Sequence, residues 1–195
     1  MAKRGHLFLL IGPSGSGKTT LIQEVRQRTP LVRFIPTTTT RPPRPGEENG
    51  REYYFVSAQE FDQLIQRGEL LEWQWVHGQR YGTSRRRFAD AIAQGLLGMT
   101  SIDVLGGVAV KAAFPLDSTS IFVRPSSLDE LRRRLVARGD TVGEDMDRRL
   151  GRAEMEIAQA SACDEVLIND DGRLVEAADR LVRIMDPWLQ QAEDR

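Results

Sequence analysis

The stretch HLFLLIGPSGSGKTTLIQEVRQR, His6 to Arg28, is the strongest indication of the fold in this sequence. Its first six residues form a short apolar run, as buried parallel strands do, and the residues from Thr19 onward are typical of a helix. Between them lies GPSGSGKT, Gly12 to Thr19, which fits the phosphate-loop pattern G-x-x-x-x-G-K-[ST]. That pattern is meaningful only between a strand and a helix, and the sequence supplies both.

The residue types of this loop suit the phosphates of a nucleoside triphosphate. Glycines let backbone N–H groups point into one cavity, and the following helix adds its positive N-terminal end. We expect Lys18 to reach the β- and γ-phosphates and Thr19 to offer its hydroxyl to Mg²⁺. The residues expected to bind the triphosphate are Gly12, Pro13, Ser14, Gly15, Ser16, Gly17, Lys18, Thr19 and Thr20.

Strand-like and helical segments alternate along the rest of the chain. Further strands are expected over residues 32–36, 52–57, 96–103, 118–123 and 164–169. The run from Gly68 to Ser84 predicts a hairpin that turns at His77, Gly78 and Gln79. Helices are expected over 58–67, where Ser57 and Glu60 form a capping box, and over 128–138 and 143–161. This alternation predicts an α/β fold with a mostly parallel sheet and helices on both faces.

Composition narrows the class of protein. The 195 residues fit one domain or a domain with insertions. With 27 basic and 28 acidic residues, the chain has no overall positive charge that would attract a polyanion. Leu7 to Ile11 is shorter than a signal-peptide core of roughly 7 to 15 residues, and no segment approaches a membrane span. The single cysteine, Cys163, fits a reducing compartment. We expect a soluble, cytoplasmic protein with no nucleic-acid or membrane partner.

A second stretch, TTTTRPPRPGEENG from Thr37 to Gly50, would by itself be taken for a polar loop. Followed by EYYFVS, GELLEW, RYGTS, SIDVLGG, RRRLVARG, DRRLGRAEMEI and VLINDD, it resembles guanylate kinase over roughly Leu7 to Met185. The resemblance implies a P-loop nucleoside monophosphate kinase fold, ATP and Mg²⁺ as donor and cofactor, and GMP and dGMP as acceptors. Arg41, Arg138, Arg149 and Lys18 are the catalytic residues that it implies.

The resemblance also implies an acceptor site. Arg41 and Arg44 would hold the phosphate of GMP, which suits a guanidinium fork, and Tyr53 and Tyr81 would donate hydroxyls to it. Two carboxylates, Glu72 and Asp103, complement the N1–H and N2–H donors of guanine. Thr37 and Thr83 would donate to the base acceptors O6 and N7.

On the donor side the resemblance implies lid arginines and an adenine pocket. Arg134, Arg138 and Arg149 would cover the adenine and the triphosphate, and Asn169 would line the adenine pocket. Acidic neighbours of this arginine-rich run, including Asp129 and Glu130, predict a mixed-charge, solvated helix surface rather than an RNA site.

We expect one domain over residues 1–195. Its core would take 1–33 and 84–195 with a lid at about 134–152, and 34–83 would form an inserted GMP-binding lobe. Lobe and lid would close over the nucleotides and exclude water, in a monomer or a homodimer. Two departures from the family are Ser101, in place of an acidic residue, and Gln79 with Arg80, in place of an Asn-Tyr pair.

Two alternative functions stay open. A kinase of the same architecture could act on a phosphorylated sugar, and it would have no use for Glu72 and Asp103. A non-catalytic module could bind phosphorylated peptides through Arg41, Arg44 and Tyr53. Such a module would not need Lys18 and Thr19, so their presence favours an enzyme.

Overall fold

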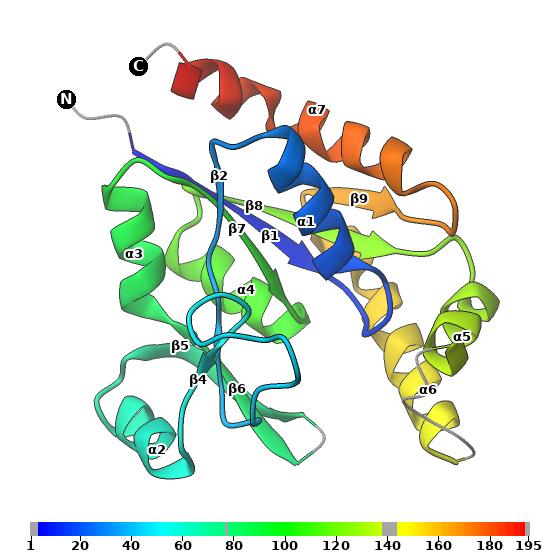
Figure 1. Cartoon of the computed structure of the whole chain (residues 1–195), viewed down its shortest axis with the longest axis horizontal. Coiled ribbons are helices and arrows are strands. Elements are labelled where there is room, and N and C mark those ends of the chain that lie inside the picture. The colour runs from blue at the N-terminus through cyan, green and yellow to red at the C-terminus, as the bar shows by residue number, and fades with distance from the viewer. Residues whose placement is uncertain (1–3, 77, 138–143, 194–195) are drawn as a thin grey trace. The chain divides into compact units, whose positions relative to one another are not determined.

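The structure is a computed structural model that describes residues 4–76, 78–137 and 144–193 (Figure 1). The chain divides into two compact units. The first unit runs to Leu9 and continues from Val32 to Ser118, and the second takes Leu10 to Leu31 and the chain from Thr119 onward. Each unit carries one group of the expected site residues.

The main sheet has five strands in the order β2-β7-β1-β8-β9. They span β1 His6–Ile11, β2 Val32–Phe34, β7 Leu97–Ile102, β8 Ser118–Arg124 and β9 Glu165–Ile168. In the first unit β2 runs parallel to β7, with Val32 opposite Leu97, and in the second β8 runs parallel to β9, with Ile121 opposite Glu165. Every residue of β1 is buried, as its continuous apolar run predicts for a parallel strand. The α/β fold expected from the sequence is confirmed.

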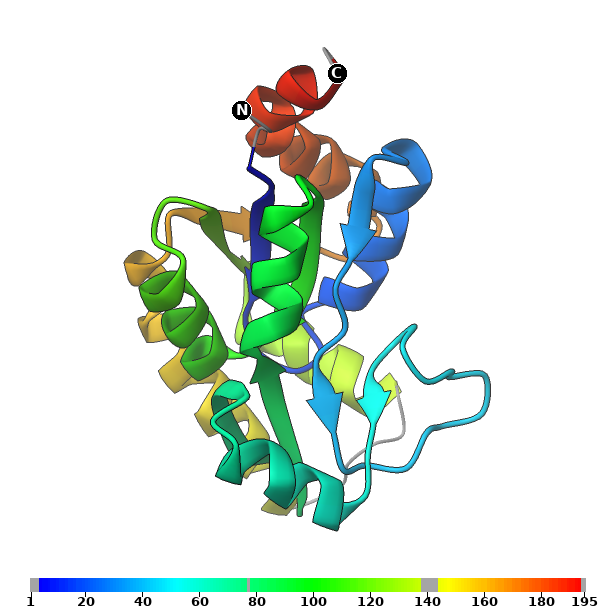
Figure 2. The same ribbon diagram turned by 90° about the vertical axis from the view of Figure 1, so that its left-hand side faces the viewer.

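The first unit also contains a four-stranded sheet in the order β4-β3-β6-β5. Its strands are β3 Thr38–Thr39, β4 Tyr54–Phe55, β5 Leu70–Val76 and β6 Gln79–Ser84, and β5 pairs with β6 as the expected hairpin. Its turn residue His77 lies outside the described residues. The loop between β3 and β4 extends away from the two strands that it joins (Figure 2).

Three helices complete the first unit: α2 Ala58–Gln66, α3 Arg85–Ala93 and α4 Val104–Ala113. The capping box predicted at the start of α2 is confirmed, since Ser57 accepts from the Glu60 N–H and Glu60 accepts from the Ser57 N–H. The strand expected over 52–57 forms only at Tyr54 and Phe55. The Phe55 N–H donates to Asn49 Oδ1 within the loop, and Ser57 is already a helix cap.

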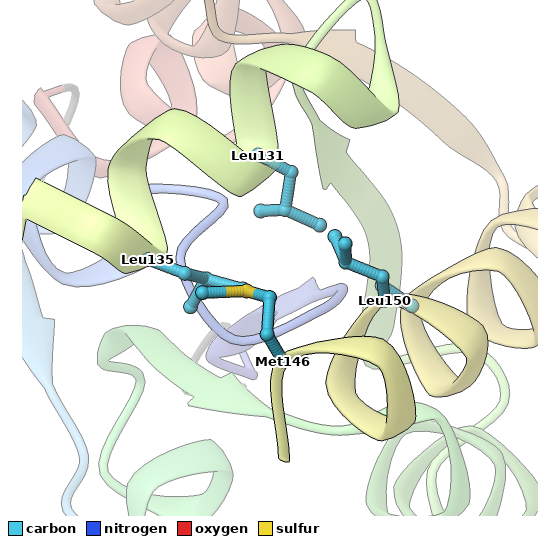
Figure 3. Close-up of a cluster of buried hydrophobic side chains, with 5 residues drawn as sticks. Leu131, Leu135, Met146 and Leu150 are labelled. Atoms are coloured by element: carbon cyan, nitrogen blue, oxygen red, sulfur yellow. The ribbon is translucent and has the colours of Figure 1, made fainter. Parts of the chain in front are cut away.

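The second unit packs α1 Lys18–Arg28 beside α7 Leu174–Glu193, as Figure 1 shows. It also holds α5 Leu128–Ala137, α6 Glu144–Ala158 and a short 3₁₀ helix, η1 Ala160–Ala162. Leu131 and Leu135 of α5 pack with Met146, Leu150 and Ala153 of α6 in a buried cluster (Figure 3). Among the residues that the structure describes, no helix is both long enough and apolar enough to cross a membrane.

Candidate active site

The P-loop lies at the end of β1 and is shaped by three glycines with positive φ. Gly12, Gly15 and Gly17 have φ values of 143°, 87° and 87°, a region that L side chains rarely adopt. At Gly12 a Cβ would collide with the Val123 carbonyl oxygen, and at Gly17 with the Asn169 side chain. The backbone therefore approaches its neighbours more closely than any other residue would allow, which is the condition for a cradle of main-chain amides.

Lys18 and Thr19 stand at the start of α1, where the loop becomes a helix. The Lys18 ammonium donates to the carbonyl oxygens of Gly12 at 2.5 Å and Pro13 at 2.9 Å, so its side chain folds back over the loop. The Thr19 side chain is exposed. Ser16 is fully buried, and its hydroxyl oxygen has no hydrogen-bond partner. The loop thus carries a cation and a free buried hydroxyl around its glycines.

The other expected donor residues occupy different places in the second unit. Asn169 follows β9, is 4% exposed, and donates from Nδ2 to the Ser16 carbonyl oxygen at 2.9 Å. Arg134 on α5 is half-buried and binds Glu130 and Asp171. Arg149 on α6 is half-buried. Arg138, and with it part of the expected lid over 134–152, lies outside the described residues.

A cluster of arginine, tyrosine and acidic side chains lies at the loop between β3 and β4. The Arg41 guanidinium is 5.5 Å from the ring centroids of both Tyr53 and Phe55, and the Tyr53 and Tyr81 rings meet edge-on at 5.8 Å. Burial raises the pKa of Tyr53, so its hydroxyl stays protonated and able to donate. Arg44 is exposed on the same loop. Arg41, Tyr53 and Tyr81 are thus brought together as expected.

Glu47 also belongs to this cluster, although it was not among the residues expected from the sequence. Its Oε1 accepts from Arg41 Nη2 at 2.9 Å, and its Oε2 accepts from the Arg44 backbone N–H at 2.7 Å. Burial alone would lower the pKa of Arg41, but Glu47 and Tyr81 raise it. The signal was present in the sequence, as an acidic residue in a prolyl-rich loop directly after two arginines. Glu47 occupies the position that an anionic phosphate would compete for.

The run of threonines before Arg41 anchors this loop to β6. Thr39 Oγ1 donates to the Arg80 carbonyl oxygen at 2.9 Å and accepts from the Arg41 N–H at 3.1 Å. Thr40 Oγ1 donates to Gln79 Oε1 and accepts from the Arg80 N–H at 2.9 Å. Thr37 is 7% exposed. These hydroxyls fix the start of the loop, so the run is part of the site's scaffold rather than low complexity.

Arg80 itself faces α2. It is 7% exposed, pairs with Asp62, donates to the Ala58 carbonyl oxygen at 2.7 Å, and stacks over the Phe61 ring at 4.8 Å. Arg80 therefore fastens α2 to β6.

The two carboxylates expected to recognise guanine lie close together. Asp103 caps α4 by accepting from the Gly106 N–H at 2.9 Å, and Glu72 projects from β5. A Cβ placed on Gly106 would be 3.2 Å from Glu72 Oε1 and 3.5 Å from Asp103 Oδ1. Thr83, 1% exposed on β6, donates its hydroxyl to Glu72 Oε1 at 2.7 Å. Its proton is thus directed at Glu72, not at a base.

The environment of Glu72 changes its acidity. Burial raises the pKa of Glu72 from 4.5 to about 7, the Asp103 charge adds to the rise, and the Thr83 hydrogen bond opposes it. A buried carboxylate of this kind favours a ligand with N–H donors, because these donors replace the hydrogen bonds to water that the carboxylate lost on burial.

A glycine-cradled P-loop on a parallel sheet, accompanied by an arginine-tyrosine cluster and a pair of acceptor-only carboxylates, defines a P-loop kinase of a nucleotide. The chain belongs to the guanylate kinase family, whose model matches residues 4–187.

Relatives agree with this assignment. A guanylate kinase from Dechloromonas aromatica is 44% identical over 177 residues, 91% of this chain and 86% of that protein. One from Frankia casuarinae is 44% identical over 179 residues, 92% of this chain and 96% of that protein. The crystal structure of guanylate kinase from Anaplasma phagocytophilum matches with a TM-score of 0.76 at 30% identity, covering 96% of this chain and 87% of that one. A shikimate kinase from Bacteroides thetaiotaomicron, with a TM-score of 0.53 at 15% identity over 93% of this chain and 98% of that one, shares the fold alone.

Proposed function

We propose that the chain transfers the γ-phosphoryl group of ATP to GMP, and also to dGMP, through the groups of residues described above. The enzyme class is that of its family, a nucleoside monophosphate kinase that serves purine nucleotide metabolism. The observation that supports guanine most strongly is the pairing of Glu72 with Asp103 around Gly106, since two acceptor-only groups complement the N1–H and N2–H of guanine. The residues proposed to bind the base and the phosphate would leave the ribose 2′-hydroxyl without a role, so dGMP should be accepted as well.

The acceptor phosphate would bind by exchange of partners at Arg41. Glu47 holds the Arg41 guanidinium at 2.9 Å, and a phosphate that offers more negative charge would replace it as the acceptor. Arg44, Tyr53 and Tyr81 would complete the grip on that phosphate, with Thr37 and Thr83 beside the base. Because a nucleotide phosphate is already anionic near neutral pH, the reaction needs no side-chain base.

The donor would bind at the P-loop. Lys18 would leave the carbonyl oxygens of Gly12 and Pro13 for the β- and γ-phosphates, and Arg149 with Arg138 would spread the charge of the transferring group. When bound, Mg²⁺ would offset the negative charge of the phosphates during the transfer. Thr19, which is exposed in the first turn of α1, would offer its hydroxyl oxygen to Mg²⁺, and phosphate oxygens and water would supply the other ligands.

Three further proposals follow the family resemblance. Residues 34–83 would act as a GMP-binding lobe on a core of 1–33 and 84–195, and 134–152 as a lid. Asn169 would lie beside the adenine. The protein would work in the cytoplasm as a monomer or a homodimer.

A coupled assay of ADP release from Mg·ATP, with GMP, dGMP, AMP, UMP and CMP as acceptors, tests this function. We expect turnover with GMP and dGMP, and its loss in Lys18→Ala. Equal turnover of AMP would refute the base assignment. A sugar-phosphate kinase would keep its activity when Glu72 or Asp103 is replaced, and a phosphopeptide module would show no ADP release with any acceptor.

A further inference from the structure

Glu130, in the first turn of α5, is a buried acid. It is 6% exposed, although the sequence predicted a solvated, mixed-charge helix surface here, so that prediction is wrong for this residue. Its Oε1 accepts from Arg134 Nη2 at 2.6 Å and from the Asp171 backbone N–H at 2.6 Å. A buried carboxylate persists only when it is paired and hydrogen-bonded, and both conditions are met. Glu130 thus links α5 to the turn that follows β9.

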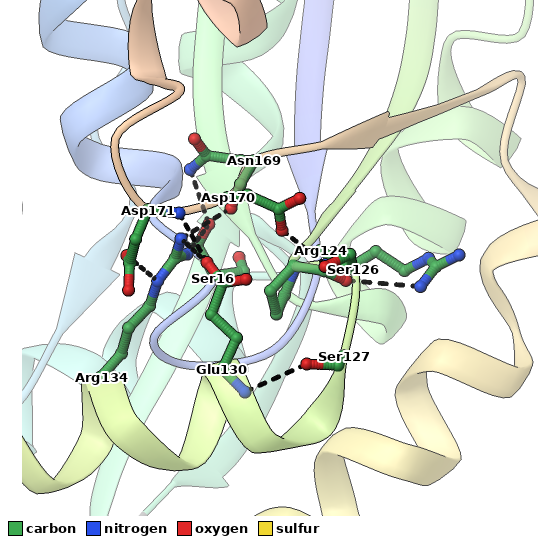
Figure 4. A network of polar contacts seen from close by, with 10 residues as sticks. Ser16, Arg124, Ser126, Ser127, Glu130, Arg134, Asn169, Asp170 and Asp171 are labelled. Atoms are coloured by element: carbon green, nitrogen blue, oxygen red, sulfur yellow. Dashed lines mark hydrogen bonds and ion pairs between the residues drawn. The ribbon is translucent and has the colours of Figure 1, made fainter.

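Arg134 extends this link to the P-loop. Its Nε donates to Asp171 Oδ1 at 2.7 Å and its Nη2 also donates to the Asn169 carbonyl oxygen at 2.8 Å. Its Nη1 lies 3.5 Å from the Ser16 carbonyl oxygen. The guanidinium has a rigid, planar fork of donors, so these partners fix both its position and its plane. Figure 4 shows the Arg134 side chain among Glu130, Asp171, Asn169 and Ser16.

The Ser16 carbonyl oxygen therefore accepts hydrogen bonds from two side chains. Besides Arg134, the Asn169 side chain donates to it at 2.9 Å, so closely that a Cβ on Gly17 would collide with the Asn169 amide. Asn169 is itself held through its backbone, whose N–H donates to the Arg124 carbonyl oxygen at 2.9 Å. The network has a single convergence point, the peptide between Ser16 and Gly17.

That peptide is planar and trans, so its carbonyl and its N–H point in opposite directions. Fixing the Ser16 carbonyl therefore fixes the direction of the Gly17 N–H. Main-chain amides of a P-loop are the groups that cradle phosphates, and their value depends on being aimed before the ligand arrives.

We propose that Glu130 and Arg134 are positioning residues for the donor nucleotide, which lock the Ser16–Gly17 peptide so that its N–H faces the phosphates of ATP. This inference rests on the proposed binding of ATP at the P-loop. It differs from the expectation that Arg134 covers the triphosphate directly, because here its effect passes through Ser16 and depends on Glu130. Positioning predicts a change in ATP binding, whereas direct stabilisation of the transferring group predicts a change in kcat.

Steady-state kinetics of Glu130→Gln, Arg134→Met and Arg134→Lys separate the two roles. Loss of the aligned amide should raise the KM for ATP about tenfold in Glu130→Gln and Arg134→Met, as expected when one charge-assisted contact is lost. The KM for GMP and kcat should stay near wild type, and Arg134→Lys should be intermediate. Arg133→Met, an exposed neighbour on the same helix, is the matched control and should behave as wild type. The double variant should be no worse than Arg134→Met, because the two residues act as one unit.

Calorimetric titration with magnesium tripolyphosphate reads the P-loop without the base or any turnover. In Glu130→Gln, the affinity for magnesium tripolyphosphate should fall by the same factor as the affinity for Mg·ADP. A wild-type KM for ATP in Glu130→Gln, or a fall in kcat with unchanged KM for ATP in Arg134→Met, would overturn the proposal. If either variant does not fold, Arg134→Lys decides, and a wild-type KM for ATP in it is then the contrary result. Failure of the proposed function would be recognised separately, as a wild-type enzyme with no GMP-dependent turnover.

Discussion

Replacing Glu72 with glutamine should stabilise the unliganded protein and impair its recognition of GMP. Burial and the neighbouring Asp103 raise the pKa of Glu72 from 4.5 to about 7. At about 1.36 kcal/mol per pKa unit, keeping Glu72 ionised costs up to about 3 kcal/mol of folding free energy. Glutamine is nearly isosteric, still accepts from Thr83, and carries no charge, so Glu72→Gln should recover most of this amount near pH 8.

The sign of the pH dependence follows from the raised value. A carboxyl whose pKa is higher in the folded state contributes stability below its unfolded pKa of 4.5 and loses it as the pH rises through about 7. The stability gap between Glu72→Gln and the wild type should therefore be largest near pH 8 and fall to less than about 1 kcal/mol near pH 5. Urea unfolding at both pH values, without nucleotide, measures the gap.

GMP binding should show the opposite preference. Guanine N–H donors favour the ionised Glu72, so the affinity for GMP should fall as the pH drops below about 7. Glu72→Gln should lose this step and bind GMP about tenfold to a hundredfold more weakly near pH 8, the range for a hydrogen bond to a charged group. The phosphate of GMP titrates in the same way in both experiments, so its contribution to the pH dependence cancels when the two proteins are compared. A Glu72→Gln variant that is no more stable than wild type near pH 8, or that keeps the pH step in its affinity for GMP, would show that Glu72 is not the buried carboxyl with the raised pKa.

Substitutions at Arg41, Gly17 and Ser16 also have defined outcomes. Arg41→Ala should raise the KM for GMP about a hundredfold. Arg41→Lys should raise it about tenfold, because lysine keeps the charge but lacks the planar fork of donors. A KM for GMP in Arg41→Ala that stays within about a factor of two of wild type would show that Arg41 does not bind GMP. Gly17→Ala should lower the free energy of unfolding by at least about 1–2 kcal/mol and weaken ATP binding, because φ is 87° and the new Cβ would collide with Asn169. Gly151→Ala is the control, since a Cβ at Gly151 meets no atom within 4 Å, and it should have neither effect. Equal melting curves for the two variants would contradict this. Ser16→Ala should raise the unfolding free energy by about 1 kcal/mol, because the buried hydroxyl has no partner, and a lower melting temperature would show that a contact was lost instead.

The features that the sequence predicted are those with local causes. The P-loop glycines need positive φ, the β1 run is buried along its whole length, and Ser57 with Glu60 forms a capping box, so each can be recognised from adjacent residues. The hairpin of β5 and β6 likewise follows from alternation between nearby strands. The resemblance to the family placed Arg41, Tyr53 and Tyr81 in one site, and the structure has these three side chains in one cluster.

What the sequence could not provide depends on contacts between distant residues. Glu130 looks like any solvated helix acid until Asp171, far along the chain, donates to it. The two-residue strand β3 exists because Tyr54 and Gly82 pair with Thr38, and propensity gives no signal for so short a strand.

The chain moves a phosphoryl group from ATP to a guanine nucleotide, as its family does. Chromatographic analysis of the products formed from Mg·ATP and GMP tests it most directly. We expect ADP and GDP in equal amounts, no GDP with Lys18→Ala, and unchanged AMP when AMP replaces GMP. Release of ADP with inorganic phosphate but no GDP, or conversion of AMP as fast as of GMP, would contradict it.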